Sequence, residues 1–359
     1  MSKFHSIRIA SIERDTRDAV VVTFDVPAHL RDAFRFAAGQ HLTLRTQLGG
    51  ADLRRSYSIC APEGDALRIA VKRAPGGTFS AFANEVLQRG DRIDVMAPMG
   101  HFTLQPSDGQ PRHYLGVAAG SGITPLVSLV ATALAADART RFTLIYGNRA
   151  SSTVMFRDAL AALKDQYLDR FNLVHVLSRE AQDIELLHGR IDRAKADALF
   201  ERWVRVDDVD AAFLCGPDAM MEAVRGSLIA HGVAPECVRV ERFAASIPKH
   251  THVVRPLAVD ANAQCEITVV VDGARRTFAA DKGRENVIDA GLRQGVELPY
   301  SCKGGVCSTC RCLLVEGEVD MDVNFALEDY EVARGFVLAC QSYPVTDKVT
   351  LDFDRTSAT

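Results

Sequence analysis

The 359-residue sequence lacks a strong excess of either charge. Its 42 Lys and Arg residues stand against 46 Asp and Glu residues, which gives a net charge of −4. This near balance excludes a strongly basic nucleic-acid-binding protein. Internal repeats and low-complexity tracts are also missing. Apolar residues make up 47% and charged residues 25% of the chain, as in ordinary globular proteins. The length predicts two to three domains.

The sequence also lacks an unbroken hydrophobic run long enough to cross a membrane. Residues 114–136 carry no charged side chain, but a glycine turn and Pro125 interrupt them. A strand, a turn and a buried helix therefore explain this segment better than a membrane span. Residues 1–10 contain no apolar core of a signal peptide. We expect a cytoplasmic protein with no membrane and no nucleic-acid partner.

Cysteine is plentiful by comparison and unevenly placed. Five of the nine cysteines fall between residues 302 and 340, and the other four are scattered. An odd number with tight local clustering argues against a disulfide framework of the kind found in secreted proteins. It favours metal binding or redox chemistry.

The first 243 residues show two successive secondary-structure patterns. Short β-rich runs at 7–12, 19–26, 41–44, 56–60, 67–72 and 93–96, with one helix near 78–88, predict a closed barrel or a sandwich. From about residue 113, apolar runs at 114–119, 141–146, 171–177 and 211–215 alternate with helical patterns. That alternation predicts a doubly wound α/β domain with a parallel sheet.

The last part of the chain has a composition of its own. Periodicity lapses after Phe243, which predicts a linker over residues 246–262. A β-hairpin around the Asp272-Gly273 turn, a short helix near 285–293 and a Cys-rich loop follow. Residues 263–359 carry 16 acidic and 10 basic side chains, hence a charge of −6. We expect a separate acidic domain here.

The clustered cysteines have the spacing of a plant-type [2Fe–2S] ferredoxin. Cys302, Cys307 and Cys310 are separated by four and two residues, and Cys340 follows after 29 more. Thiolates suit this cluster because soft sulfur ligands stabilise its iron–sulfide core, so we predict these four as the metal ligands. A structural zinc site or buried free thiols are the alternatives, although zinc sites prefer paired Cys knuckles. Cys312 is interpreted as a strand thiol.

A second motif, Arg55-Ser56-Tyr57-Ser58, resembles the Arg-x-Tyr-Ser/Thr motif of the ferredoxin–NADP reductase superfamily. The resemblance implies an FAD-binding β-barrel domain over residues 1–108. In it Arg55 neutralises the FAD pyrophosphate, Tyr57 stacks on the isoalloxazine and Ser58 bonds near flavin N5. Downstream, Gly76, Gly77 and Ser80 lie at the start of the helix near 78–88, where free N–H groups can hold a phosphate.

The third motif lies in the predicted nucleotide domain, residues 109–245. Gly120, Gly122, Thr124 and Pro125 belong to a glycine turn between a strand and a helix, the setting of a dinucleotide phosphate site. The Pro125 ending resembles the form found in the same superfamily. The likeness also implies that Cys215 and Gly216 lie beside the nicotinamide, so we name Ser58 and Cys215 as the catalytic residues.

Four further residues are predicted to select the nucleotide or cover the flavin. Ser178 and Arg179 end a strand, and a hydroxyl with a guanidinium suits the 2′-phosphate of NADPH, to which Arg149 can add charge. In plant-type relatives an aromatic residue ends the reductase and covers the flavin. Phe243 is our candidate for this place, but the chain here continues into the predicted linker.

Together the motifs predict a relay from NADPH through FAD to a [2Fe–2S] cluster in a β-grasp ferredoxin domain, residues 263–359. Over almost its whole length the sequence resembles the reductase subunits of phenylacetyl-CoA 1,2-epoxidase complexes, which implies a di-iron oxygenase as the partner. The likeness is carried by Phe4 to Ser6, Gln40 to Leu44, Arg55 to Cys60, Phe142 to Arg149, Leu187 to Asp192, Glu241 to Phe243 and Leu298 to Cys310.

Two alternatives remain open at this point. The same relay could serve another client, such as a ring- or steroid-hydroxylating oxygenase or a hybrid-cluster protein, because all of these need the same electron supply. A redox carrier or sensor without NADPH turnover is the second alternative. The intact Arg55, Tyr57, Gly120, Gly122 and Cys215 argue against it.

Overall fold

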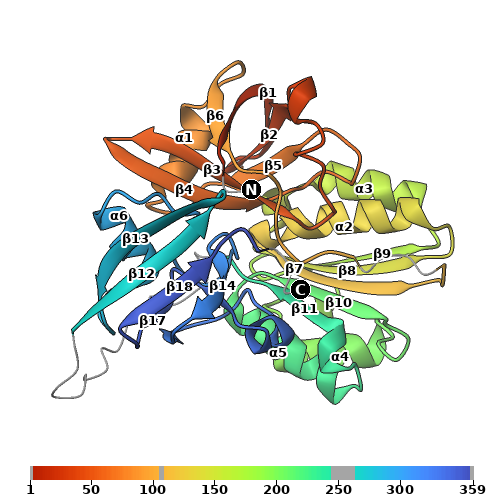
Figure 1. The fold of residues 1–359 in the computed structure, drawn as a ribbon. Coiled ribbons are helices and arrows are strands. Elements are labelled where there is room, and N and C mark those ends of the chain that lie inside the picture. Colours follow the sequence, from red (N-terminus) through yellow and green to blue (C-terminus); the bar gives the residue numbers. More distant parts are fainter. Residues whose placement is uncertain (1–2, 105–108, 244–262, 356–359) are drawn as a thin grey trace.

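A computed structural model describes residues 3–104, 109–243 and 263–355, which form three sheet-based units (Figure 1). The predicted linker, residues 246–262, and part of the predicted boundary near residue 108 lie outside the described residues. The domain limits of the sequence analysis therefore remain predictions. The multidomain fold class is confirmed.

The first unit is an antiparallel barrel. Its six strands lie in the order β4-β3-β6-β1-β2-β5. A bridge between Ile59 and Ile69, and a 2.9 Å hydrogen bond from the Cys60 N–H to the Arg68 carbonyl, join the two ends of this order and close it. The elements are β1 (His5–Thr16), β2 (Ala19–Asp25), β3 (His41–Leu48), β4 (Ala51–Ser58), β5 (Arg68–Lys72), α1 (Thr78–Glu85) and β6 (Arg92–Val95).

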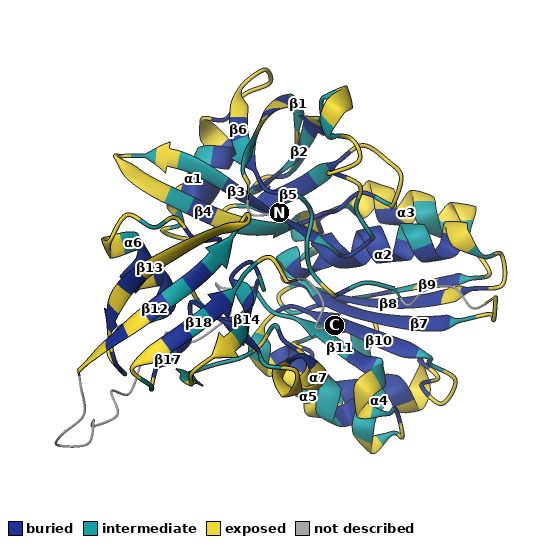
Figure 2. Cartoon of the chain, in the orientation of Figure 1, coloured by how far each residue is buried: buried dark blue, intermediate teal, exposed yellow. Residues whose placement is uncertain are grey.

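The second unit is a doubly wound parallel sheet in the order β11-β10-β7-β8-β9. Its core strands are buried on both faces, where α2 and α3 cover one side and α4 and α5 the other (Figures 1 and 2). The elements are β7 (His113–Ala119), α2 (Ile123–Ala136), β8 (Arg141–Asn148), α3 (Arg157–Gln166), β9 (Phe171–Leu177), α4 (Arg193–Arg202), β10 (Ala211–Cys215), α5 (Asp218–Ala230) and β11 (Val238–Glu241). The strand order reverses between β7 and β10, so their carboxyl ends form the usual ligand-binding crevice of such folds.

The third unit is a mixed sheet with one short helix packed on it, as a β-grasp requires. Its five-stranded sheet runs β13-β12-β18-β14-β16, with β12 and β18 parallel. The elements are β12 (Gln264–Val271), β13 (Ala274–Asp281), α6 (Val287–Arg293), β14 (Arg311–Glu316), β15 (Val319–Met321), α7 (Asp329–Ala333), β16 (Phe336–Leu338), β17 (Ser342–Pro344) and β18 (Lys348–Asp352). Asp272 and Gly273 both have positive φ, which confirms the predicted hairpin turn.

The hydrophobic cores show how these units are joined. Barrel residues such as Ala70 and Phe102 belong to the same buried cluster as Leu129 and Phe213 of the parallel-sheet unit. The Phe102 and Phe213 rings meet edge to face at 5.3 Å. The buried cluster of the third unit, in contrast, contains only residues from 265 onward. The first two units therefore share apolar packing, whereas the third has a core of its own.

Several elements differ from their predicted bounds; the strand expected at 56–60, for example, is β4, which begins at Ala51 and ends at Ser58. The helix expected near 78–88 ends at Glu85, and the parallel sheet has a fifth strand, β11, that the sequence analysis did not identify. This strand is only four residues long, and its Val-Arg-Val-Glu alternation is too short to stand out. It matters because it carries Glu241 to the carboxyl end of the sheet, beside Cys215.

Candidate functional site

The predicted flavin motif lies on β4 and the residues around it. Arg55 is exposed, and its Nη1 donates to the Arg54 carbonyl at 2.7 Å. Tyr57 packs against Phe79 of α1 with a ring separation of 5.5 Å. Burial raises the pKa of Tyr57 and keeps the phenol neutral. Tyr57 thus adjoins the first turn of α1, the place at which the sequence predicts a bound phosphate.

Glycine and serine shape the turn before α1. Gly76 has a φ of 70°, and a Cβ on Gly77 would lie 2.5 Å from Ser80 Oγ. Ser80 Oγ accepts a hydrogen bond from the Ala74 N–H at 3.0 Å and donates one to the Gly77 carbonyl at 2.9 Å. These bonds fix the loop before α1, and contact of Ser80 with a bound phosphate stays a prediction.

The glycine turn of the nucleotide domain approaches the carboxyl end of β10 very closely. Gly120 has a φ of 55°, and its carbonyl accepts from the Tyr146 hydroxyl at 2.9 Å. A Cβ on Gly122 would lie 2.1 Å from the Cys215 carbonyl oxygen. Thr124 and Pro125 are buried in α2, where Thr124 Oγ1 donates to the Ser121 carbonyl at 3.0 Å. Only glycine fits position 122, because any side chain would push the two strand ends apart.

A cleft of about 940 Å³ opens at this edge of the sheet. Its walls combine the glycine turn, Gly216 and Phe243 with barrel residues Lys72 and Arg73. The cleft therefore runs from the parallel sheet to the barrel, as a nucleotide that meets a barrel-bound flavin requires.

Only some of the residues predicted to select the nucleotide line this cleft. Arg149 and Ser178 line it, whereas Arg179 is exposed and does not. Arg190, which the sequence analysis did not select, does line it. Arg190 follows Gly189 in an irregular segment and does not end a strand, so its neighbours in the sequence give no sign of a nucleotide site.

Ser58, Glu241 and Cys215 meet where the barrel touches the parallel sheet. Ser58 Oγ donates to Glu241 Oε2 at 2.8 Å, and Glu241 is the register partner of Cys215 in the β10–β11 pair. Desolvation raises the pKa of Glu241 to about 8 against the opposing effect of the Ser58 hydrogen bond. Burial, with a smaller effect from Glu241, also raises the pKa of Cys215. The Glu241 carboxyl is therefore largely protonated and neutral, and it lies next to Ser58 and Cys215, the two predicted catalytic residues.

Glu241 gives a testable pH dependence of stability. Its native pKa lies above that of an exposed glutamate, so between about pH 4.5 and 8 the native state binds more protons than the unfolded chain. The contribution of Glu241 to the free energy of unfolding of the wild type is therefore at its full value below about pH 4.5. It falls as the pH rises from about 4.5 to 8, by up to about 1.4 kcal/mol per pH unit. The Glu241→Gln variant lacks this loss. Denaturant unfolding at pH 5 to 8 should show it gaining stability relative to the wild type with rising pH; a constant difference would contradict the assignment.

The four predicted cluster ligands converge around one loop of the third unit. Cys302 lies within hydrogen-bonding reach of Cys307 and Cys340, and Cys310 within reach of Cys340. The Cys307 pKa is raised by the Cys302 thiol and by burial, because these thiols are crowded closely together. Cys312 points elsewhere, with its Sγ 3.8 Å from the Val337 carbonyl.

Backbone and amide donors surround these sulfurs. The Gly304 N–H lies 3.3 Å from Cys302 Sγ, and Gln341 Nε2 lies 3.6 Å from Cys340 Sγ. Lys303 and Ser308 both adopt positive φ, which curls the loop around the thiols. Donors aimed at thiolates stabilise their negative charge. In the described residues no group of three or more His, Cys, Asp and Glu has the geometry of a single-ion site. A [2Fe–2S] cluster does not need three or more protein ligands around a single ion, because each of its two irons takes two of the four thiolates. The donor set therefore fits this cluster.

The cluster loop rests on the barrel strands that carry the flavin motif. Ser301 Oγ accepts from Ser56 Oγ at 2.9 Å, and Thr309 Oγ1 lies 3.3 Å from Thr43 Oγ1. Ser301 precedes Cys302, and Thr309 precedes Cys310. The structure thus brings the predicted nucleotide, flavin and cluster sites into one continuous region.

Comparisons with known proteins match this arrangement. Three family models cover the chain in order: oxidoreductase FAD-binding domain (residues 6–104), oxidoreductase NAD-binding domain (117–226) and 2Fe-2S iron-sulfur cluster binding domain (269–345). The chain is 45% identical over 356 residues to one of the subunits of 1,2-phenylacetyl-CoA epoxidase from Escherichia coli K12, with 99% of each chain covered.

Two further similarities extend over the same length. The ferredoxin reductase component of 3-ketosteroid-9-alpha-monooxygenase from Mycobacterium tuberculosis H37Rv is 34% identical, with 97% of this chain and 96% of that protein covered. The crystal structure of phthalate dioxygenase reductase aligns over 98% of both chains at a TM-score of 0.56 and 24% identity, which shows a shared fold. None of the helices in the described ranges is both long and apolar enough to span a bilayer.

Proposed function

Because this chain belongs to the family of oxygenase reductase components that join FAD-binding, NAD-binding and 2Fe–2S domains, we propose that it supplies electrons from NADPH to the di-iron oxygenase of a phenylacetyl-CoA 1,2-epoxidase. The electron-transfer reductase function belongs to the family. The particular oxygenase, the preference for NADPH and the residue roles below are our proposals.

One observation carries the relay most directly. Two hydroxyls of β4, two residues apart, join this strand to the other two units: Ser58 donates to Glu241 at the end of β11, and Ser56 donates to Ser301 beside the cluster loop. Tyr57 lies between them on the same strand. A flavin held by this strand therefore lies close to both the predicted electron donor and the predicted electron acceptor.

The chain's residues bind and align, whereas the cofactors carry the redox chemistry. When bound, the nicotinamide supplies a hydride, the flavin accepts the pair and releases single electrons, and the cluster carries one electron at a time. We expect Arg55 to neutralise the flavin pyrophosphate, and Ser58 and Glu241 to hold a proton where β4 meets the parallel sheet. Gly122 allows the nucleotide turn to approach Cys215, and Phe243 closes one wall of the cleft.

The partner is tested by reconstitution. The purified protein, NADPH and the oxygenase subunits of a phenylacetyl-CoA epoxidase should together convert phenylacetyl-CoA to its epoxide in the presence of O2, which supplies the epoxide oxygen and is otherwise reduced to water. Omission of the reductase is the control. A steroid-hydroxylating oxygenase, or a hybrid-cluster protein, tested in parallel should receive electrons much more slowly. Faster transfer to either one would assign the chain to that client, and no NADPH oxidation at all would reject the reductase function.

Nucleotide preference is tested with Arg190. A guanidinium facing the 2′-phosphate is worth about 1.5–3 kcal/mol, so Arg190→Ala should lower kcat/KM for NADPH by about 10- to 100-fold. The value for NADH should hardly change, because NADH lacks that phosphate. Arg179→Ala is the matched control, since Arg179 lies outside the cleft lining. A larger effect of Arg179→Ala would instead indicate that Arg179, as predicted from the sequence, binds the 2′-phosphate.

All nine cysteines lie among the described residues and are free thiols. Thiols that must stay available for iron suit a reducing compartment. We accordingly propose that the protein works in the cytoplasm.

A further inference from the structure

Two arginines stand directly opposite each other on the barrel strands that face the third unit. Arg45 of β3 and Arg54 of β4 are register partners in the antiparallel pair. Like charges directly opposite each other in a sheet are unfavourable unless anions compensate them. Each arginine has one anion within the barrel. Asp94 binds Arg45 at 2.9 Å, and Asp52 binds Arg54 at 3.1 Å.

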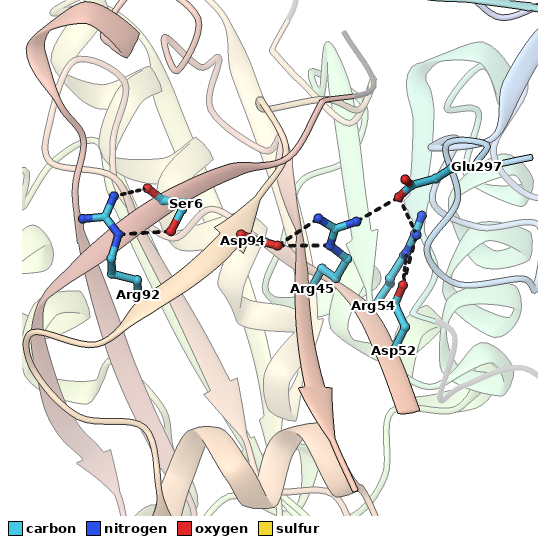
Figure 3. A network of polar contacts seen from close by, with 7 residues as sticks. All are labelled: Ser6, Arg45, Asp52, Arg54, Arg92, Asp94 and Glu297. Atoms are coloured by element: carbon cyan, nitrogen blue, oxygen red, sulfur yellow. Dashed lines mark hydrogen bonds and ion pairs between the residues drawn. The ribbon is translucent and has the colours of Figure 1, made fainter. Parts of the chain in front are cut away.

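A third anion reaches this pair from the other unit. One oxygen of Glu297, Oε1, accepts from Arg45 Nη1 at 2.8 Å and from Arg54 Nη2 at 3.0 Å (Figure 3). The Arg54 side chain is only 3% exposed, and it also donates to the Leu298 carbonyl at 3.3 Å. Its guanidinium lies 4.1 Å from the centroid of the Tyr300 ring. Glu297 thus links two cations of the barrel to the segment that leads into the cluster loop.

This contact is central to how the third unit is held. The buried apolar cluster of that unit contains none of the barrel residues, whereas the barrel and the parallel-sheet unit share one. Contacts between the third unit and β3 and β4 include Glu297 with the two arginines, Arg54 with Leu298 and Tyr300, Ser56 with Ser301, and Thr43 with Thr309. Polar contacts of this kind position surfaces and are sensitive to salt.

Residue 297 is also well placed to control the cluster loop. Residues 296–300 have no regular secondary structure, so side-chain contacts must fix their path. Ser301 and Cys302 follow directly, and Ser301 makes the contact with the flavin strand. A shift of Glu297 and Leu298 away from the arginines would therefore move the first cluster ligand away from β4.

We propose that Glu297, bridging Arg45 and Arg54, is a positioning residue that holds the [2Fe–2S] loop against the flavin-bearing strands for electron transfer within the chain. The inference rests on the proposed relay and names a residue that controls the rate of its second step, electron transfer from the flavin to the cluster. Glu297 touches no cofactor site assigned above. The step it affects is flavin-to-cluster transfer, and the step from NADPH to flavin is left unchanged.

The test uses the full-length holoprotein, three single variants and one double variant. Glu297→Gln removes the charge, Glu297→Lys sets a third cation against the two arginines, and Glu266→Gln is the control. Glu266 lies on β12 of the same unit, and its side chain is 59% exposed against 65% for Glu297, so neither substitution empties a core. Anaerobic rapid mixing with NADPH follows the flavin and cluster absorption bands separately. Amide hydrogen exchange of residues 297–301 and of β4, measured without NADPH, reports docking itself.

Flavin reduction should keep its wild-type rate in every variant. Cluster reduction should slow about threefold or more in Glu297→Gln and about tenfold or more in Glu297→Lys, with faster exchange at residues 297–301, because the buried Arg54 loses the anion that the third unit supplies or gains a repulsive cation in its place. Arg45→Gln combined with Glu297→Gln should be no slower than Glu297→Gln alone, since the two groups act as one pair. Glu266→Gln should match the wild type.

Two results would overturn the proposal. Cluster reduction and exchange in Glu297→Lys equal to those in Glu266→Gln would show that the bridge holds nothing. Faster exchange with an unchanged cluster rate would show that it docks the unit without positioning the loop for transfer. Failure of the proposed function is distinguishable from these results. In that case NADPH would not reduce the flavin of the wild type, while the exchange comparison between variants would still report docking.

Discussion

Cys310→Ser is expected to abolish electron delivery to the oxygenase while leaving NADPH-dependent reduction of the flavin intact. The variant should lose the visible absorption of the cluster and its stoichiometric iron, because hydroxyl oxygen is a poor substitute for a thiolate on iron. Changes to groups that merely support metal ligands cost about 10- to 100-fold, so loss of a ligand should reduce oxygenase turnover by at least about 100-fold. Iron content, absorption spectra and turnover with oxygenase measure this.

The matched control is Cys312→Ser, two residues farther along. Cys312 is buried in β14 with its Sγ 3.8 Å from the Val337 carbonyl, outside the group of four thiols. It should retain the cluster and most of the turnover, at some cost in stability. If Cys312→Ser lost its iron and Cys310→Ser kept it, the ligand assignment would be wrong.

Gly122→Ala is expected to have the largest effect on the first step of the relay. The added Cβ would lie 2.1 Å from the Cys215 carbonyl oxygen, a contact that backbone movement alone can relieve. That movement separates the glycine turn from the end of β10, where the nicotinamide is predicted to lie. Misplacement by about 1 Å can cost about 100-fold in rate, and we expect a loss of this size in flavin reduction by NADPH.

Gly226→Ala provides the comparison within the same unit. Gly226 lies inside α5, and the atom nearest to its added Cβ is the mobile end of the Arg193 side chain, at 3.0 Å. Alanine is the better helix former there, so this variant should fold well and reduce flavin at the wild-type rate. Similar losses in both variants would indicate a general sensitivity to substitution rather than a requirement of the nucleotide turn.

Local motifs made the individual sites predictable. The cysteine spacing, the glycine turn and the Arg-Ser-Tyr-Ser strand each lie within a short stretch of sequence, and their chemistry depends on residues close together in the chain. The structure brings the four clustered thiols together and the glycine turn to the end of β10, and the roles of these residues stay predictions. The short β-rich runs predicted a barrel or a sandwich, and the alternating apolar segments predicted the parallel sheet, whose strand order fixes the position of the crevice.

The parts that the sequence did not reveal depend on contacts between distant residues. Glu241 meets Ser58 across 183 positions, and Glu297 meets Arg54 across 243. An acidic residue at the end of a four-residue strand, or in an irregular segment, carries no local sign of a buried partner. Arg190 was missed for the same reason, because only the folded chain brings it to the wall that Arg149 and Ser178 share.

The central claim, that one chain carries electrons from nucleotide to cluster, is tested most directly by anaerobic rapid mixing of the wild-type holoprotein with NADPH at several protein concentrations. The flavin band should bleach first and the cluster band afterwards, at a rate that does not depend on protein concentration. A cluster that stays oxidised, or one whose reduction rate rises in proportion to protein concentration, would contradict the account.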